Sequence, residues 1–326
     1  MDQTLDDLIS QMTNGDRRAL SRLLTIVEKQ DEDAFTVLKQ IWSKSKRGFA
    51  IGITGPAGAG KSSLIDQMIR RLRDKNFKVG VIAVDPSSPF SGGAVLGDRI
   101  RMQRHSQDPD VFIRSVGSHG KSGGISFATR ALVQLMKAYG CDYIIIETVG
   151  AGQSEVEVMN IVDTTLVLLM PEAGDSVQAL KAGILEIADL YVVNKKDRPG
   201  AERVVQDIRA MLSLVPNENP WNPPVFQTDS VSGEGVDDVL EGVFSHRQFL
   251  GSHPSLKIEH ARRWKEMIDL AQAKFMAVLV EREEHNFELR EKIEDSNLNI
   301  YQLLDDVLAD VGAVLAAKRP KAKSGK

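Results

Sequence analysis

The spacing of apolar residues divides the chain of 326 residues into distinct parts. In residues 4–46 apolar side chains recur every three or four positions, which predicts short amphipathic helices. In residues 48–249 short apolar runs alternate with helix-length segments, a pattern typical of a mainly parallel sheet with helices on both faces. After Pro254 the helical spacing returns. The pattern therefore predicts an α/β protein with helical ends.

Seven apolar runs are the expected strands, and helices separate most of them, so we expect a doubly wound, mainly parallel sheet. The runs cover residues 49–54, 79–84, 111–115, 143–147, 165–170, 191–193 and 225–228. We assign residues 1–47 to an N-terminal helical segment, 48–250 to the α/β domain, 251–317 to a C-terminal helical arm and 318–326 to a basic flexible tail. The apolar stripe of the arm is expected either to pack on a second copy of the chain or to fold back on its own domain.

The first strand leads into a glycine-rich loop. Residues 55–62 match the pattern GxxxxGK[ST] and stand between the strand and an amphipathic helix. The glycines let backbone N–H groups turn onto phosphate oxygens, Lys61 supplies positive charge to the β- and γ-phosphates, and Ser62 is the expected magnesium ligand. The predicted phosphate contacts are Gly55, Pro56, Ala57, Gly58, Ala59, Gly60, Lys61, Ser62 and Ser63.

The sixth expected strand is followed by residues 194–197, which have the form NKxD. The carboxylate of Asp197 can accept hydrogen bonds from guanine N1–H and from the 2-amino group, whereas adenine offers neither donor there. An unpaired buried carboxylate would cost on the order of 1–3 kcal/mol, which favours GTP over ATP. We therefore predict GTP and GDP as ligands, with Asn194, Lys195 and Asp197 at the base.

A second predicted base contact follows the last strand, in the segment Ser-Val-Ser-Gly-Glu-Gly at residues 230–235. Its glycines open the next helix, and its backbone N–H groups are expected to face the guanine O6. The residues assigned to this contact are Ser230, Val231 and Ser232.

Acidic residues stand at the ends of two further strands. Glu147 ends an apolar strand and is soon followed by Gly150, at the position where nucleotide-hydrolysing proteins sense magnesium and the γ-phosphate. Asp85 ends the second strand and Asp98 follows a Gly-rich stretch, so either could hold magnesium through water or orient the attacking water. Asp98 also fits the N-cap of a helix over residues 99–105. The predicted catalytic set is Lys61, Asp85, Asp98 and Glu147, and the predicted magnesium set is Ser62, Asp85, Asp98 and Glu147.

Composition and charge limit the classes of partner and the compartment that we expect. A formal charge of -4 gives no reason to expect nucleic acid or a membrane as partner, and no apolar run reaches the length of a membrane span. The acidic start of the chain is unlike a secretory signal, and the single cysteine, Cys141, is expected to be a buried residue in a reducing compartment. We expect a cytoplasmic protein. The histidines do not cluster, so His246, His253 and His260 are expected at the surface.

The motifs, taken in order, resemble the MeaB/ArgK family. The strings that carry the resemblance are GPAGAGKSS, VIAVDPSSPFSGGAVLGDRIRM, IIIETVGAGQSE, the KAG at residues 181–183 and NKKD, and the resemblance covers nearly the whole chain. Members of this family are GTPases that chaperone adenosylcobalamin-dependent acyl-CoA mutases such as methylmalonyl-CoA mutase.

The resemblance implies a homodimer joined by the C-terminal helices, in which GTP hydrolysis gates cobalamin delivery and protects the mutase from inactivation. It also implies that residues 172–181 face the mutase, with Asp175 and Lys181 as coupling residues. The chain departs from the family at Val231, where a small residue such as Ala often follows the serine.

Two other functions share parts of the pattern. A nickel-delivery or other metal-delivery GTPase has the same phosphate chemistry but normally carries a His-rich tract or closely spaced cysteines, which this chain lacks. A kinase would need an acceptor pocket with a base, and no segment of the sequence is identified as supplying one.

Overall fold

The computed structural model describes residues 4–28, 32–45, 48–85, 103–105, 107–117, 124–148, 161–171, 187–214, 220–253, 264, 266–276, 278–279, 304, 307–309 and 311–313. The chain forms two compact units, Met1–Lys265 and Glu266–Lys326. Among the described residues no helix is both long and apolar enough to cross a bilayer.

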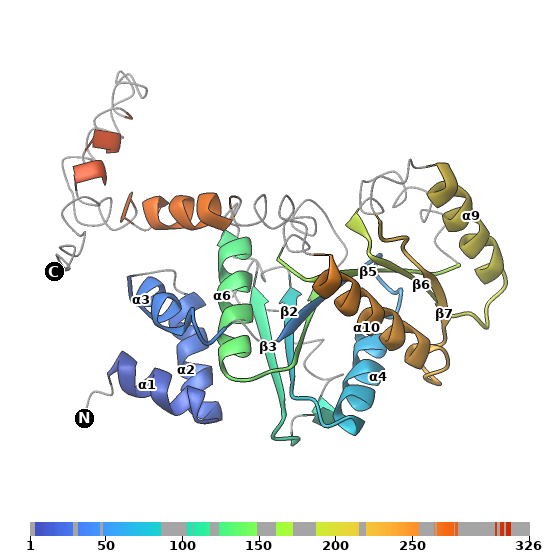
Figure 1. Ribbon diagram of the computed structural model, residues 1–326, viewed down its shortest axis with the longest axis horizontal. Coiled ribbons are helices and arrows are strands. Elements are labelled where there is room, and N and C mark those ends of the chain that lie inside the picture. The colour runs from blue at the N-terminus through green and yellow to red at the C-terminus, as the bar shows by residue number, and fades with distance from the viewer. Residues whose placement is uncertain are drawn as a thin grey trace. The chain divides into compact units, whose positions relative to one another are not determined.

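The first unit contains a seven-stranded parallel sheet with the strand order β3-β2-β4-β1-β5-β6-β7 (Figure 1). The expected strands are confirmed to within two residues at each end, and the doubly wound fold is confirmed with them. The strands are β1 (Phe49–Thr54), β2 (Val79–Asp85), β3 (Val111–Gly117), β4 (Tyr143–Thr148), β5 (Thr164–Leu169), β6 (Leu190–Asn194) and β7 (Val225–Thr228).

The central strands are buried along their whole length. Every residue of β1, β4, β5 and β6 is buried, which explains why they read as continuous apolar runs and not as alternating patterns. β1 lies between β4 and β5, so β2, β3 and β4 lie on one side of it in the sheet and β5, β6 and β7 lie on the other. In an open α/β sheet this reversal leaves a crevice at the carboxyl ends of the strands.

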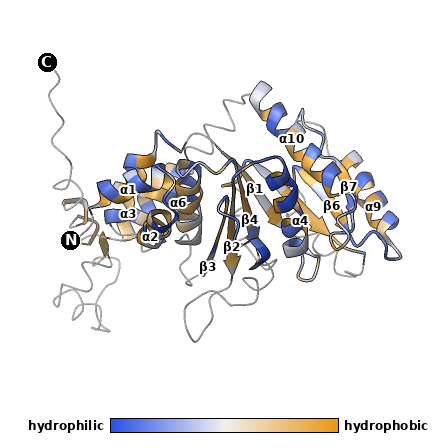
Figure 2. Cartoon of the chain, turned by 90° about the horizontal axis from the view of Figure 1, so that it is seen from below, coloured by the Kyte–Doolittle hydropathy of each residue, from blue (hydrophilic) through white to orange (hydrophobic). Residues whose placement is uncertain are grey.

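Helices cover both faces of the sheet (Figure 2). α4 (Lys61–Asp74) and α10 (Val236–Ser252) pack against one face, where Ile51, Ile53 and Leu168 share a core with both helices. α9 (Ala201–Leu214) packs on the opposite face against Val167 and Val193. α6 (Gly124–Ala138) covers β2 and β4.

Three N-terminal helices belong to the same compact unit as the sheet: the second and third pack on α6, and the first packs on those two. They are α1 (Leu5–Thr13), α2 (Arg17–Glu28) and α3 (Glu32–Ile41). Thr4 is the N-cap of α1, and its hydroxyl accepts a hydrogen bond from the Asp7 N–H at 3.2 Å. The Phe35 and Phe127 rings, whose centroids are 5.3 Å apart, join α3 to α6.

Two buried side chains test the expectations drawn from composition. Cys141 is buried as expected, and this burial raises the pKa of its thiol to about 12. The surface assignment of His246 is wrong, because only 3% of the residue is exposed. Its Nδ1 lies 2.7 Å from Thr164 Oγ1 and its Nε2 lies 3.5 Å from Asp189 Oδ1. His246 continues the buried stripe of α10 that contains Val239 and Val243, and this spacing outweighs its polarity.

The second unit is helical where it is described, in residues 266–276, 307–309 and 311–313. Val278 and Val311 are buried, at 4% and 1% exposure. Large apolar side chains in the same unit are exposed, namely Met267, Met276, Leu304 and Leu308. The division of the chain at residues 250 and 317 stays a prediction.

Candidate nucleotide site

Most of the predicted site loops begin at the carboxyl ends of neighbouring strands. The phosphate loop follows β1, Glu147 lies near the end of β4, Asn194 ends β6, and the loop of residues 229–235 follows β7 (Figure 1). We call residues 229–235 the base loop. Because β1 pairs with β4, and β6 with β7, the fold brings these segments to one edge of the sheet.

The phosphate loop approaches its neighbours too closely for most side chains. A Cβ atom on Gly55 would lie 2.0 Å from the Leu168 carbonyl oxygen. A Cβ on Gly60, whose φ is +96°, would lie 2.2 Å from Nδ2 of Asn194. Gly60 is the N-cap of α4 and has no side chain to occupy the helix end, which leaves the first turn suited to an anion.

Lys61 turns back over its own loop. Its side chain donates hydrogen bonds from Nζ to the carbonyl oxygens of Gly55, at 2.7 Å, and Pro56, at 3.1 Å. The residue is 7% exposed. The ammonium group therefore lies within the loop that is predicted to surround the phosphates.

Ser62 and Glu147 meet at the same edge. The Ser62 hydroxyl donates to Glu147 Oε1 at 2.7 Å, and the residues are 8% and 6% exposed. A hydroxyl and a carboxylate in contact are hard oxygen donors of the kind that Mg²⁺ prefers, so the pair fits the predicted magnesium site. Asp85 ends β2 next to β4, and its side chain lies outside the described residues, as do Asp98 and Gly150.

Asn194 connects the phosphate loop to the base loop. Its Nδ2 donates to the Ala59 carbonyl oxygen at 2.7 Å. Its Oδ1 accepts hydrogen bonds from Thr228 Oγ1 at 3.1 Å, Ser230 N at 2.9 Å and Ser230 Oγ at 2.8 Å. With 3% of the residue exposed, the structure shows Asn194 as a link between loops, and a direct contact with the base stays a prediction.

The other predicted base residues lie around this link. Lys195 has a positive φ of 59°, and its Nζ contacts Met170 Sδ at 3.3 Å, while Asp197 is exposed on the following turn. In the base loop, Ser230 is buried, whereas Val231 and Ser232 are exposed. Asn194 and Asp197 thus lie at the same edge of the sheet, where Asn194 is buried and Asp197 is exposed.

Asp229 is a structural residue of the base loop that the sequence interpretation did not include. Its carboxylate accepts hydrogen bonds from the Val231 N–H at 3.0 Å and the Ser232 N–H at 3.3 Å. Hydrogen bonding to Ser232 and to the Val231 N–H lowers the pKa of Asp229. An aspartate two residues before such N–H groups is typical of an Asx turn, and this signal was available in the sequence.

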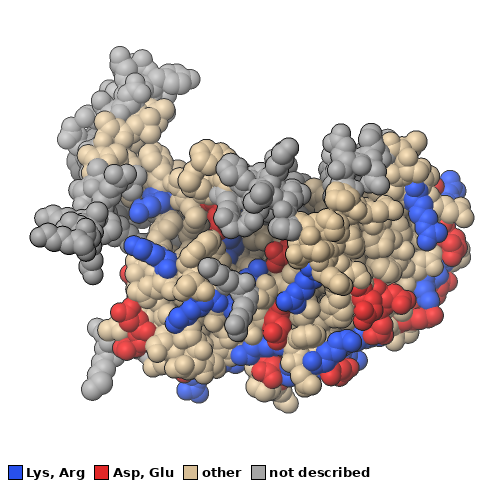
Figure 3. Space-filling view, viewed as in Figure 1, with Lys and Arg blue, Asp and Glu red and all other residues tan. Residues whose placement is uncertain are grey.

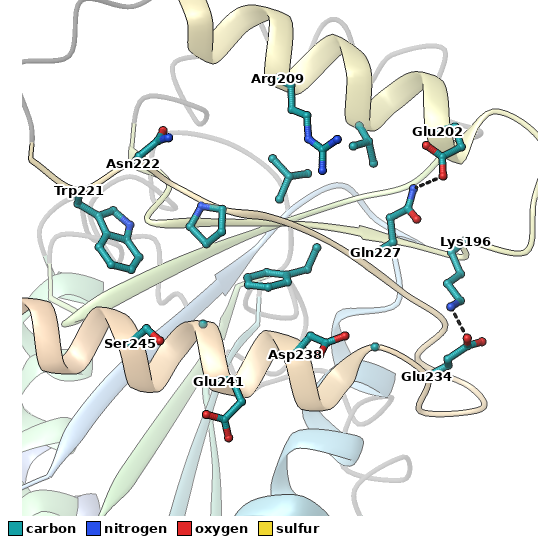
Figure 4. Close-up of a pocket in the computed structure, with 16 residues that line it drawn as sticks. Lys196, Glu202, Arg209, Trp221, Asn222, Gln227, Glu234, Asp238, Glu241 and Ser245 are labelled. Carbon is teal, nitrogen blue, oxygen red and sulfur yellow. Dashed lines mark hydrogen bonds and ion pairs between the residues drawn. The ribbon is translucent and has the colours of Figure 1, made fainter.

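A pocket of about 870 Å³ lies beside the base loop, and neither Lys61 nor Glu147 is among its lining residues (Figure 4). It lies between α9 and α10 beside β7, and Lys196 and Glu234 form part of its lining. Acidic side chains gather over α10 in Figure 3, and two of the exposed ones, Asp238 and Glu241, line this pocket. None of the predicted phosphate or magnesium residues lines it.

Comparison with known families decides the class of the protein. The model of a family described as methylmalonyl Co-A mutase-associated GTPase MeaB matches residues 20–284. The chain belongs to the MeaB family. It is therefore a GTPase and binds guanine nucleotides, as the NKxD segment predicts.

Relatives from distant organisms agree with this membership. A relative from Pyrococcus abyssi is 41% identical over 313 residues, covering 94% of this chain and 97% of its own. GTPase ArgK of Escherichia coli is 35% identical over 76% of this chain and 77% of its own. The mouse protein named methylmalonic aciduria type A homolog, mitochondrial, is 33% identical over 78% of this chain and 66% of its own.

A solved structure supports the MeaB-family fold. The crystal structure of a protein named LAO/AO transport system kinase aligns with a TM-score of 0.68 and 25% identity. The alignment covers 97% of this chain and 99% of that one.

We predict that Gly60→Ala lowers the affinity for GDP by at least about tenfold. The added Cβ would displace the Asn194 amide, which is hydrogen-bonded both to the phosphate loop and to the base loop. Gly140→Ala is the matched control, since Gly140 has the same φ of +96° with no atom within 4 Å of the added Cβ. Fluorescent GDP titration and thermal melting measure both variants. Equal affinity in the two would contradict the close-packing argument.

Proposed function

We propose that the protein is a magnesium-dependent GTPase that gates adenosylcobalamin delivery to methylmalonyl-CoA mutase or a related acyl-CoA mutase, and protects or reactivates that mutase. The observation that carries the catalytic part is the buried contact of Ser62 with Glu147 beside the loop that holds Lys61. Family membership supports the mutase part, because the family description names a methylmalonyl-CoA mutase association.

The residues at the phosphate end of the site have different proposed roles. Lys61 exchanges the carbonyl oxygens of Gly55 and Pro56 for the charged oxygens of the β- and γ-phosphates, which accept stronger hydrogen bonds. Ser62, Asp85, Asp98 and Glu147 would hold magnesium, and the three acids are also the proposed groups that orient the attacking water. When bound, the ion neutralises charge that develops on the transferred phosphoryl group.

The base is selected at the other end of the site. Asp197 accepts hydrogen bonds from guanine, and the base loop faces the guanine O6. To donate to O6, an N–H group of Ser230, Val231 or Ser232 would leave the acceptor it has in this structure, which is Asn194 Oδ1 for Ser230 and the Asp229 carboxylate for the other two. This division is supported by the exposure of Asp197 and Val231 on adjacent turns, which are held together through Asn194. The phosphate end and the base end of the site thus bind different parts of the nucleotide, and Asn194 joins them by hydrogen bonds.

We predict that Ser62→Ala lowers GTP hydrolysis by at least about a hundredfold and weakens its dependence on magnesium, because one oxygen ligand is lost. Affinity for GDP in excess EDTA should change little, since Glu147 is the described hydrogen-bond partner of the hydroxyl. Ser62→Thr keeps the hydroxyl and should retain most activity. Phosphate release measured across a magnesium titration distinguishes the variants, and wild-type turnover in Ser62→Ala would refute the assignment.

The mutase role predicts a functional effect in a reconstituted reaction. When the activity of purified adenosylcobalamin-dependent methylmalonyl-CoA mutase is followed through turnover, addition of this protein with GTP should slow the loss of activity or restore it. Lys61→Ala with GTP is the matched control, because it removes the cation at the phosphates. If wild type and Lys61→Ala protect the mutase equally, GTP hydrolysis does not drive the effect.

We also propose that the C-terminal arm joins two copies of the chain. The exposed Met267, Met276, Leu304 and Leu308 support this, because large apolar side chains on a helical arm gain stability when a second arm covers them. Sedimentation equilibrium of the full chain should give a dimer mass, and Met267→Glu with Leu304→Glu should shift it toward a monomer. A monomeric wild-type chain at micromolar concentration would refute the proposal.

A further inference from the structure

The helix that carries the phosphate-binding residues also holds the base loop. α4 begins at Lys61, and further along it Arg71 donates a hydrogen bond to the base loop. We infer that Arg71 is a positioning residue for base recognition, which fixes the base loop relative to the phosphate loop and so contributes to the preference for guanine over adenine. This inference rests on the proposed contact of the base loop with the guanine O6.

The guanidinium group of Arg71 joins three structural elements. Its Nη2 donates to the Gly233 carbonyl oxygen at 2.7 Å, and its Nε donates to Asp237 Oδ1 at 2.9 Å. Its Nη1 donates to Gln67 Oε1 at 2.8 Å, one turn earlier on α4. A planar guanidinium group can satisfy all three directions at once, and a lysine ammonium on a flexible stem cannot reproduce that geometry.

The base loop is shaped to accept this contact. Gly233 has a φ of +86°, and a Cβ there would lie 2.9 Å from Gln67 Oε1 and 3.0 Å from Arg71 Nη2. Gln67 adds a longer contact, from its Nε2 to the Val231 carbonyl oxygen at 3.4 Å. Two adjacent turns of α4 therefore contact the backbone of the loop on either side of Ser232.

An ion pair between Lys196 and Glu234 also holds the base loop, but it is more exposed than Arg71. Lys196 Nζ lies 2.5 Å from Glu234 Oε1, with the side chains 28% and 65% exposed (Figure 4). Arg71 is 19% exposed, although its partner Asp237 is 74% exposed. Exposed ion pairs add little stability because solvent screens them, so the part-buried bond from Arg71 to the Gly233 carbonyl is the stronger restraint.

The consequence is a particular pattern of nucleotide affinities. GDP and IDP both carry the O6 oxygen that the base loop is proposed to contact, whereas ADP has an amino group there. Loss of the Arg71 restraint should weaken GDP and IDP together and leave ADP unchanged. General damage to the nucleotide site would instead weaken all three, because all three share the diphosphate.

The test measures the affinities of GDP, IDP and ADP by displacement of a fluorescent GDP analogue. Arg71→Met should raise the Kd for GDP and IDP by about tenfold, the loss expected for a charge-assisted hydrogen bond, with ADP unchanged. Arg71→Lys should be intermediate. Arg70→Met is the matched control on the same helix, because Arg70 pairs with Asp66 on α4 at 3.0 Å and should leave all three affinities as in wild type.

Gly233→Ala disturbs the same hydrogen bond from the side of the loop, because the added Cβ would crowd Arg71 Nη2, and it should reproduce the affinities of Arg71→Met. Equal loss for all three nucleotides, or no difference between Arg71→Met and Arg70→Met, would overturn the inference. Asp197→Ala is the positive control, since it should reduce the preference of GDP over IDP, which differ only in the 2-amino group. A wild-type protein that binds ADP as tightly as GDP would refute the proposed base recognition itself, independently of Arg71.

Discussion

The arrangement of the nucleotide site depends on one buried amide. Asn194 donates to the carbonyl of Ala59 in the phosphate loop and accepts hydrogen bonds from Thr228 at the end of β7 and from Ser230 in the base loop. A buried polar group that loses its partners costs about 1–3 kcal/mol, so each loop stabilises the position of the other. This explains why Gly60 must lack a side chain, because the amide occupies the space that a Cβ would need.

The parallel sheet makes this link possible. β6 and β7 are paired in register, with Asn194 opposite Thr228, so the side chain at the end of one strand reaches the loop that leaves the next. The phosphate loop arrives from β1, with β5 between β1 and β6 in the sheet. Residues far apart in sequence therefore meet because parallel strands deliver all their carboxyl ends to one edge.

The sequence was sufficient for the strands and for the motifs, and insufficient for the contacts between them. Strands such as β4 could be predicted because every residue of the strand is buried, which gives a continuous apolar run. The phosphate loop could be predicted because its motif is uninterrupted. His246 was misassigned because its burial depends on Thr164 and Asp189, which lie far away along the chain. Arg71 has no local pattern at all, since its partner Gly233 is 162 residues away.

Lys61 shows how the protein prepares for its ligand. In the structure its ammonium group lies against two carbonyl oxygens of its own loop, and these neutral acceptors hold it at the place where phosphates are proposed to bind. Charged phosphate oxygens accept stronger hydrogen bonds than carbonyls, so the exchange favours bound nucleotide without a large movement of the side chain. The β-phosphate is present in both GTP and GDP, so this interaction favours both ligands. Discrimination between them must therefore come from groups that respond to the γ-phosphate, and Lys61 and the Ser62–Glu147 pair are described groups that are proposed to do so.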